Sequence, residues 1–252
     1  MSSQPAGQPT IVFPMGGKGE RMGPIDVPTK ALVRLPKAGM TLLEYGVRTW
    51  NIDFRRVVLL VPPDYREIEN AVAALNLGCE VRCSPDPFQK CGRTKALAGA
   101  VENGSIAGDA FFIVHNPDDV VINYPGNFAA DVVRRHRENA AAGCLATVVT
   151  TDSTVHTFTG FQIGGDRVTG IEHNPVCDKK AHIGITLFEP ALAADVVAAS
   201  HDESSSDFER DMFARLAAEG RLGFFLVPHA SWIAVNTPKD LGLFDKKYVP
   251  PS

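Results

Sequence analysis

The segment TIVFPMGGKGERM, residues 10–22, decides how this 252-residue chain is read. An apolar run with the length of a buried strand passes directly into a glycine-rich turn. Because glycine has no Cβ, such a turn can fold tightly and direct successive N–H groups at anionic oxygens. Arg21 and the later Lys30 can supply the full positive charges that amide dipoles lack. We therefore expect a loop that binds polyphosphate, formed by Gly16, Gly17, Lys18 and Gly19.

The spacing of the glycines excludes two well-known phosphate loops. The dinucleotide fingerprint GxGxxG, started at Gly17, finds Gly19 but then requires a glycine where Met22 stands. The P-loop requires GxxxxGK followed by Ser or Thr, whereas Lys18 lies inside the glycine cluster. What remains is the pattern GGxGxRM, followed by PTKAL at residues 28–32.

This composite resembles the signature of the sugar-1-phosphate nucleotidyltransferases, in which a strand leads into GGxGxR(L/M), a short loop and PKxLVP before a helix. The order and spacing agree, except that Thr29 is inserted between Pro28 and Lys30. The resemblance implies that the loop glycines cradle a triphosphate and that Arg21 and Lys30 are catalytic. The alternative to a phosphate-binding loop is a glycine-rich hairpin beside ordinary surface cations.

The pattern of apolar segments predicts an α/β fold. Strand-length and helix-length segments alternate through the first half, which is typical of a Rossmann-like, open, mostly parallel mixed sheet flanked by helices. Past Cys144 the strand-like segments follow one another with little helix between them, which predicts a small antiparallel insertion on the sugar side. The expected strands are 10–15, 56–61, 80–83 and 110–114, and the expected helices are 41–50, 65–75, 94–101, 190–200, 207–219 and one from Thr237.

No low-complexity linker interrupts the chain, so we expect one nucleotidyltransferase domain over residues 1–252. Within it we expect a nucleotide-binding lobe at 9–120 and a sugar-binding lobe at 121–252.

Polar residues follow the apolar strand AFFIV at 110–114, and they include the adjacent carboxylates Asp118 and Asp119. Ligands of open α/β sheets bind beyond the carboxyl ends of strands, where two carboxylates can hold Mg²⁺. A lone aspartate there more often only caps a turn. In the resembled family the matching strand ends in PD or PDD, and the first aspartate binds the metal. The resemblance therefore implies Mg²⁺ as cofactor and Asp118 as its catalytic ligand.

Weaker matches continue along the chain. Gln89 and Gly92, before a helix at Thr94, resemble the stretch that contacts the base, although a loop glutamine is equally often a turn residue. The segments VTGIEHNP at 168–175 and HIGITLF at 182–188 resemble the sugar-side blocks of the family, with a plain β-ribbon as the alternative. The resemblance implies sugar-binding residues at Gly160, Glu172, His173, Asn174 and Gly184.

Two departures from the family pattern concern charge. Asn174 stands where a lysine normally contacts the phosphates, and Lys179 or Lys180 could replace that cation. Ala234 stands where the family has its second metal-binding aspartate. We expect Asn236, in the same turn, to serve as the second metal ligand.

Composition excludes several other classes. A net charge of −4, spread over both signs, and a pI of about 6.0 give no basic footprint for nucleic acid. There is no apolar run near ~18 residues and no secretion signal, so we expect no membrane partner and a cytoplasmic location. Five cysteines without a CxxC pair predict neither a disulfide framework nor a zinc site.

The implied reaction transfers a nucleotidyl group from a nucleoside triphosphate to a sugar 1-phosphate, releasing pyrophosphate and forming a nucleotide sugar. The departures at Asn174 and Ala234 keep a second hypothesis open, in which a weakened or inactive homologue binds nucleotide sugars as a regulator. A third is a cytidylyl- or guanylyltransferase that acts on a non-sugar alcohol phosphate. The sequence identifies neither the nucleotide base nor the sugar. It is compatible with a homo-oligomer.

Overall fold

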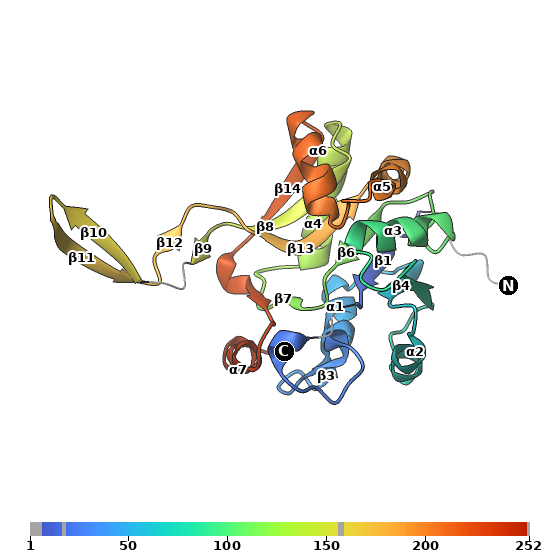
Figure 1. Ribbon diagram of the computed structural model, residues 1–252, viewed down its shortest axis with the longest axis horizontal. Coiled ribbons are helices and arrows are strands. Elements are labelled where there is room, and N and C mark those ends of the chain that lie inside the picture. The colour runs from blue at the N-terminus through green and yellow to red at the C-terminus, as the bar shows by residue number, and fades with distance from the viewer. Residues whose placement is uncertain (1–6, 17–18, 156–158, 251–252) are drawn as a thin grey trace.

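The computed structural model describes residues 7–16, 19–155 and 159–250, so Gly17 and Lys18 of the glycine-rich loop lie outside the described residues. A seven-stranded sheet forms the centre, in the order β14-β8-β13-β6-β1-β4-β5 (Figure 1). Only β13 runs antiparallel to its neighbours, which confirms the predicted mixed, mostly parallel sheet. Its strands are β1 (Thr10–Pro14), β4 (Arg56–Val61), β5 (Val81–Pro85), β6 (Phe112–His115), β8 (Ala146–Thr151), β13 (His182–Phe188) and β14 (Leu222–Val227).

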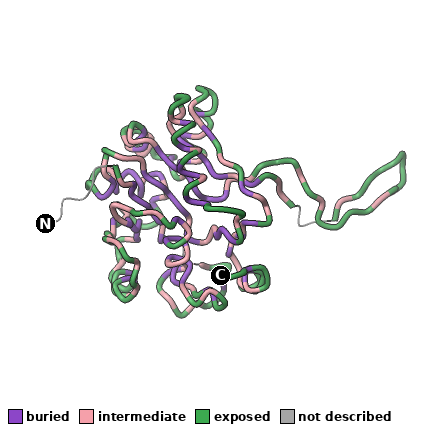
Figure 2. Tube along the Cα trace, turned by 180° about the vertical axis from the view of Figure 1, so that it is seen from behind, coloured by how far each residue is buried: buried purple, intermediate pink, exposed green. Residues whose placement is uncertain are grey.

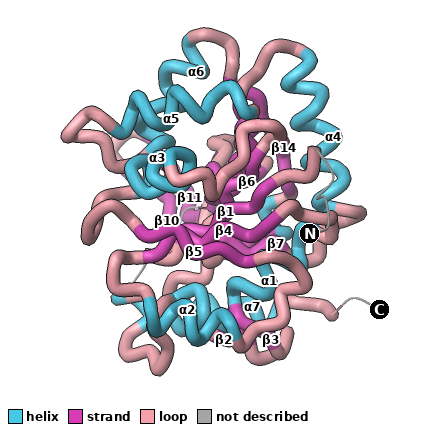
Figure 3. Tube along the Cα trace, turned by 90° about the vertical axis from the view of Figure 1, so that its right-hand side faces the viewer, coloured by secondary structure: helices cyan, strands magenta, loops and turns pink. Residues whose placement is uncertain are grey.

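Helices cover both faces of this sheet (Figure 3). Side chains alternate across β1, so Ile11 and Phe13 pack against α1, α2 and α4, while Val12 packs against α3, α5 and α6. Burial on both faces explains why β4 is apolar throughout. The helices are α1 (Leu42–Trp50), α2 (Arg66–Ala73), α3 (Arg93–Glu102), α4 (Phe128–Ala141), α5 (Ala193–Ser200), α6 (Ala214–Ala218) and α7 (Pro238–Lys247).

The expected helix at 207–219 is divided. Its first part is a π-helical stretch, Glu209–Phe213, and α6 follows directly. The other predicted helices and strands are present, with ends that differ by a few residues.

Two short antiparallel pairs border the large sheet. One joins β7 (Asp119–Val121) to β15 (Trp232–Ala234), and the other joins β2 (Arg34–Leu35) to β3 (Met40–Thr41). The first pair brings the C-terminal part of the chain next to the end of β6.

The predicted antiparallel insertion lies between β8 and β13 in the chain. It consists of β9 (Thr154–Val155) paired with β12 (Val176–Cys177), and of β10 (Thr159–Gly164) paired with β11 (Arg167–His173). In Figure 1 the β10–β11 pair extends far from the sheet, and Figure 2 shows it exposed along most of its length.

No helix in the described ranges is both long enough and apolar enough to cross a membrane.

Candidate functional site

A cavity of about 1010 Å³ lies at the carboxyl ends of β1, β4, β5 and β6. This is the edge where ligands of open α/β sheets bind. The residues that line it include Pro14, Met15, Gly16, Gly19, Arg21, Lys30, Leu60, Pro62, Asp64, Asp86, Gln89, Gly92, Arg93, Asn116, Asp118 and Asn236.

Four of the predicted residues meet in this cavity, and we call them the Lys30 cluster: Arg21, Lys30, Asp118 and Asn236. Lys30 Nζ lies 2.6 Å from Asp118 Oδ2 and donates a hydrogen bond of 2.8 Å to Asn236 Oδ1. Arg21 donates to the same amide oxygen at 2.8 Å. The Lys30 side chain is only 11% exposed, so its charge lies in a partly desolvated place. The structure thus brings together residues that are up to 215 positions apart in the sequence.

Gly19 and Thr29 place Lys30 in the cluster. Gly19 has a left-handed φ of 67°, and a Cβ there would lie 3.3 Å from the Cβ of Lys30. Glycine therefore lets the loop pass closely over Lys30. Thr29, the inserted residue, is buried and donates from Oγ1 to the carbonyl of Met15 at 2.7 Å. The insertion thus ties the lysine segment to the end of β1.

The β7–β15 ladder places the other two members of the cluster. Ala234 pairs with Asp119, and the Val235 amide donates to the Asp118 carbonyl at 2.8 Å. Asn236 follows directly and its amide donates to Asp240, which belongs to the capping box of α7. Asn236 is therefore fixed beside Asp118 by backbone pairing.

The two adjacent aspartates differ in environment. Asp118 lines the cavity, whereas the Asp119 carboxylate is held behind it, accepting hydrogen bonds from Trp232 Nε1 at 3.0 Å and Asn116 Nδ2 at 3.2 Å. Burial, together with repulsion from Asp118, raises the pKa of Asp119 to about 7. Asp118 is therefore the carboxylate available to a ligand, and Asp119 supports the strand end.

The buried His115 also fixes the segment that joins β6 to β7. His115 Nδ1 is 3.1 Å from Trp50 Nε1, which can only donate, so Nε2 carries the proton and donates to the Asp119 carbonyl at 2.8 Å. Burial lowers the pKa of His115 to about 4. The neutral ring thus serves as a fixed bridge between α1 and the start of β7.

Gly184, a predicted sugar-binding residue, lies behind the cluster and does not line the cavity. Its φ is 65°, and a Cβ would lie 2.1 Å from Asp119 Oδ2 and 2.3 Å from Asn116 Nδ2. Its carbonyl accepts from the Asn116 amide at 2.9 Å. The geometry explains this glycine by packing, and its sugar contact stays a prediction.

Gln89 and Gly92 line the cavity on the side of β5. Gln89 is exposed and donates to Asp64 at 2.8 Å. Gly92 opens α3 with a φ of 85°, and a Cβ there would lie 2.4 Å from the carbonyl oxygen of Ser206. Both residues therefore line the cavity, and their contact with a nucleotide base stays a prediction.

Sequence reasoning missed Asp86 and Arg93, which also line the cavity. Asp86 Oδ1 is buried without a hydrogen-bond partner among the described residues, and burial raises the pKa of this carboxyl to about 6. Arg93 forms ion pairs with Asp207 and Glu209 and stacks on Phe208. Asp86 follows β5 as directly as polar residues follow β6, so the strand-end rule applied to Asp118 would also have found it.

The remaining sugar-side predictions lie on the β10–β11 ribbon and the turn after it. Glu172 is directly opposite Gly160, His173 Nδ1 is 3.1 Å from Thr159 Oγ1, and Asn174 has a φ of 53°. None of them lines the cavity, so the structure does not bring them to the Lys30 cluster. Lys180, offered as a replacement cation, donates instead to the carbonyls of Asp152 and Asp178.

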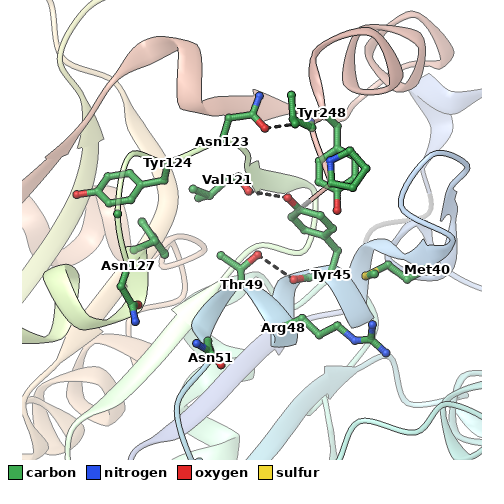
Figure 4. A pocket seen from close by; sticks show the side chains of 14 residues that line it. Met40, Tyr45, Arg48, Thr49, Asn51, Val121, Asn123, Tyr124, Asn127 and Tyr248 are labelled. Atoms are coloured by element: carbon green, nitrogen blue, oxygen red, sulfur yellow. Dashed lines mark hydrogen bonds between the residues drawn. The ribbon is translucent and has the colours of Figure 1, made fainter. Parts of the chain in front are cut away.

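A second cavity, of about 900 Å³, lies between α1, the segment after β7 and the segment after α7 (Figure 4). Tyr45 donates its hydroxyl to the Val121 carbonyl at 2.9 Å along its wall. The described residues that line it include Arg48 but neither Asp nor Glu. It therefore lacks the carboxylate oxygens that a hard cation prefers.

The Lys30 cluster could accommodate a metal ion. In the described part of the chain no group of three or more His, Cys, Asp and Glu side chains could hold one. However, Asp118 Oδ2 and Asn236 Oδ1 already converge on one cationic atom, Lys30 Nζ. Mg²⁺ takes few protein oxygens and completes its shell with phosphates and water, so this donor pair fits it.

Comparison with solved structures shows the same fold in other proteins. UDP-glucose pyrophosphorylase complexed with UDP-glucose is 13% identical, with a TM-score of 0.66 over 95% of this chain and 97% of that one. UTP-bound UGPase from Acinetobacter baumannii is 14% identical, with a TM-score of 0.66 and coverages of 95% and 92%. HddC from Yersinia pseudotuberculosis is 18% identical, with a TM-score of 0.64 and coverages of 94% and 98%.

No curated protein matches the chain. A sequence family does match it, over residues 11–218, a span that contains the glycine-rich loop, Lys30 and Asp118. Together with the shared fold, this match confirms the resemblance to sugar-1-phosphate nucleotidyltransferases. The chain belongs to the family of proteins with a MobA-like NTP transferase domain.

Proposed function

We propose that this protein transfers a nucleotidyl group from a nucleoside triphosphate to a sugar 1-phosphate, with release of pyrophosphate and formation of a nucleotide sugar. The observation that carries the proposal is the Lys30 cluster, in which two cations and one carboxylate face a cavity at the ligand-binding edge of the sheet. The cavity, at about 1010 Å³, is as large as the larger known ligand sites and suits two substrates side by side.

The reaction needs no nucleophile from the protein. An oxygen of the sugar phosphate attacks the α-phosphorus in line, the bond to the β-phosphate oxygen breaks, and pyrophosphate leaves with that electron pair. The protein must therefore align two anions and neutralise their charge.

The two cations would serve that task. Arg21 lies at the end of the glycine-rich loop and would bind the leaving pyrophosphate, while Lys30 would bind phosphate oxygens near the reacting phosphorus. Lys30 is now paired with Asp118 at 2.6 Å, so an incoming triphosphate would exchange one anion for another at Nζ. The desolvation of this lysine thus precedes substrate binding and is not repeated during the reaction.

Once Lys30 and Arg21 turn to the phosphates, Asp118 Oδ2 and Asn236 Oδ1 would become available as ligands. These two residues would hold Mg²⁺, which would supply positive charge to neutralise the charge that develops on the phosphates. Asn236 would take the place that Ala234 leaves, because its amide oxygen already lies within 2.8 Å of the same cation as Asp118.

The test measures pyrophosphate release from each common nucleoside triphosphate with a panel of sugar 1-phosphates and Mg²⁺. We expect turnover with one pair and a loss of about 100-fold or more in Asp118→Asn. Asp53→Asn, an exposed aspartate away from the cavity, is the matched control and should keep full activity.

The second hypothesis, a regulator that binds without turnover, rests on the departures at Asn174 and Ala234. Tight binding of a nucleotide sugar with no turnover in any pair would favour it. Turnover only with non-sugar alcohol phosphates would instead show a transferase of another acceptor class.

A further inference from the structure

The carboxyl group of Asp86 lines the cavity at the end of β5, and its Oδ1 atom is an acceptor that the fold does not use. The Asp86 amide donates to the Val61 carbonyl at 2.7 Å and so continues the pairing of β4 with β5. Oδ1 is buried and, among the described residues, has no hydrogen-bond partner. An aspartate after a strand commonly caps the following turn with this oxygen, and Asp86 does not. The side chain therefore keeps acceptor capacity that a ligand could use.

No cation of the described residues neutralises this carboxyl. Burial raises the pKa of Asp86 to about 6, and no neighbouring charge offsets the effect of burial. Lys90, on the same loop, is exposed, and Arg93 is already held by two carboxylates. Native proteins rarely leave a buried acceptor unpaired, so an exception that lines a cavity indicates a ligand that supplies the donor.

Asp86 and the Lys30 cluster lie against opposite ends of the glycine-rich loop. A Cβ on Gly16, the first residue of the loop, would lie 3.8 Å from Asp86 Oδ2, whereas a Cβ on Gly19, the last, would lie 3.3 Å from the Cβ of Lys30. In the sheet, β5 is two strands away from β1, which is roughly 10 Å at the usual strand spacing. A nucleotide whose phosphates contact Lys30 would therefore place its base, which carries no negative charge, towards Asp86.

Other groups on this side of the cavity also favour a base over a phosphate. Asp64 and Glu67, in the segment after β4, line the cavity as well, and their carboxylates disfavour an anion there. Gln89, the residue that the resemblance assigns to the base, donates to Asp64 at 2.8 Å. The unpaired carboxyl of Asp86 is thus the group that is free to read the base.

The common bases differ in what they present to a carboxylate, which can only accept hydrogen bonds. Guanine presents two neighbouring donors, N1–H and the 2-amino group, which match the two carboxylate oxygens as a bidentate pair. Adenine and cytosine present one amino group beside a ring nitrogen that is an acceptor, and uracil and thymine present one N–H between two carbonyl oxygens. The terminal torsion of an aspartate is broad, so a rotation about it brings both oxygens to the cavity. Guanine is then the base that meets the carboxylate with donors alone.

We propose that Asp86 selects guanine as the base of the nucleoside triphosphate, its carboxylate accepting hydrogen bonds from N1–H and from the 2-amino group. The inference deepens the proposed function and rests on it for the orientation of the nucleotide. Asp86 determines specificity and takes no part in the transfer of the nucleotidyl group.

The test measures equilibrium binding of GTP, ATP, CTP and UTP to the full chain by titration calorimetry, with Mg²⁺ and without a sugar phosphate. We expect GTP to bind at least about tenfold more tightly than the other three. Inosine triphosphate lacks the 2-amino group and should bind about tenfold more weakly than GTP. Equal binding of the four triphosphates, or tightest binding of another base, would overturn the inference.

An exchange of an acceptor for a donor supplies the second measurement. Asp86→Asn replaces one carboxylate oxygen by an amide N–H, and xanthine has a carbonyl oxygen where guanine has its 2-amino group. This variant should therefore bind xanthosine triphosphate at least about tenfold more tightly than GTP, and that gain would also show that it is folded. Asp53→Asn, an exposed aspartate away from the cavity, is the matched control and should keep the preference for GTP. A preference for GTP that survives in Asp86→Asn would overturn the inference.

Binding is measured without turnover, so this inference and the proposed function can fail separately. Guanine-selective binding that depends on Asp86, with no pyrophosphate release in any pair, would reject the proposed function and leave the inference standing. Turnover with UTP and not with GTP would support the proposed function and overturn the inference. Absence of binding by all four triphosphates would overturn it as well.

Discussion

The Lys30 cluster and the β10–β11 ribbon were both singled out by motifs, yet they occupy opposite physical situations. The residues of the cluster come from four segments and make hydrogen bonds to one another inside a cavity. The matched residues of the ribbon pair across their own hairpin, and Glu172 and His173 are exposed to solvent. A motif therefore identifies residues, whereas the topology of the sheet determines which of them lie close together.

The largest effect should come from removing the central cation. Lys30→Met deletes the one atom that contacts both Asp118 and Asn236, and it removes the positive charge beside the reacting phosphates. We expect kcat/KM for pyrophosphate release to fall by about 100-fold or more. Lys239→Met, an exposed lysine at the start of α7, should stay within about threefold of the unmodified protein. A similar loss in both variants would contradict the role given to Lys30.

A glycine comparison tests the packing behind the cluster. Gly184→Ala forces a Cβ to within 2.1 Å of Asp119 Oδ2 and strains a residue with a φ of 65°, so we expect a loss of roughly 2–4 kcal/mol in the free energy of unfolding. Gly220→Ala has a similar φ of 69° but open space around its Cβ, and should lose about 1 kcal/mol. Denaturant titration of the two variants separates the clash from the backbone strain. Equal losses would show that the contact with Asp119 contributes nothing.

The sequence predicted the parts of this molecule that a strand end or a turn fixes. Asp118 could be placed at the site because it follows the carboxyl end of β6, whereas Lys30 was found through the family pattern and is brought there by the contact of Thr29 with Met15. Asn236 was found through a family pattern, but its position depends on the β7–β15 ladder, which joins residues more than 110 positions apart. The direction of the ribbon could not be predicted, because the alternation of its residues fixes its two faces and says nothing of where the hairpin points.

A smaller effect should appear in the pH dependence of stability at the β5 side of the cavity. The pKa of Asp86 is raised by burial to about 6, so the folded protein retains a proton that the unfolded chain, with an ordinary pKa near 3.8, has lost. Asp86 therefore contributes a loss of stability as pH rises from about 4 through 6, and this contribution is absent in Asp86→Asn. We expect the stability difference between the two to grow in favour of Asp86→Asn by about 1–2 kcal/mol over that range, reduced because the carboxyl is partly exposed. For Asp53→Asn, measured in the same buffers, the difference in the free energy of unfolding from the unmodified protein should not change with pH. If the difference for Asp86→Asn were also independent of pH, the pKa of Asp86 would not be raised by burial.

The smallest effect is expected at the ribbon, where the motif and the geometry disagree. Glu172 aligns with a sugar-side motif, yet it is exposed, stands opposite Gly160 and does not line the cavity. A side chain that does not reach the substrate can change catalysis only indirectly, so Glu172→Gln should alter the KM for sugar 1-phosphate by less than about threefold, with kcat unchanged. Steady-state kinetics with saturating nucleoside triphosphate measures this, and Glu203→Gln, an exposed glutamate on the opposite side of the sheet from α1, serves as the control. A rise of about tenfold in KM for Glu172→Gln alone would show that the ribbon does reach the sugar in the working enzyme. In that case the motif would have located a residue whose place only the substrate-bound protein reveals.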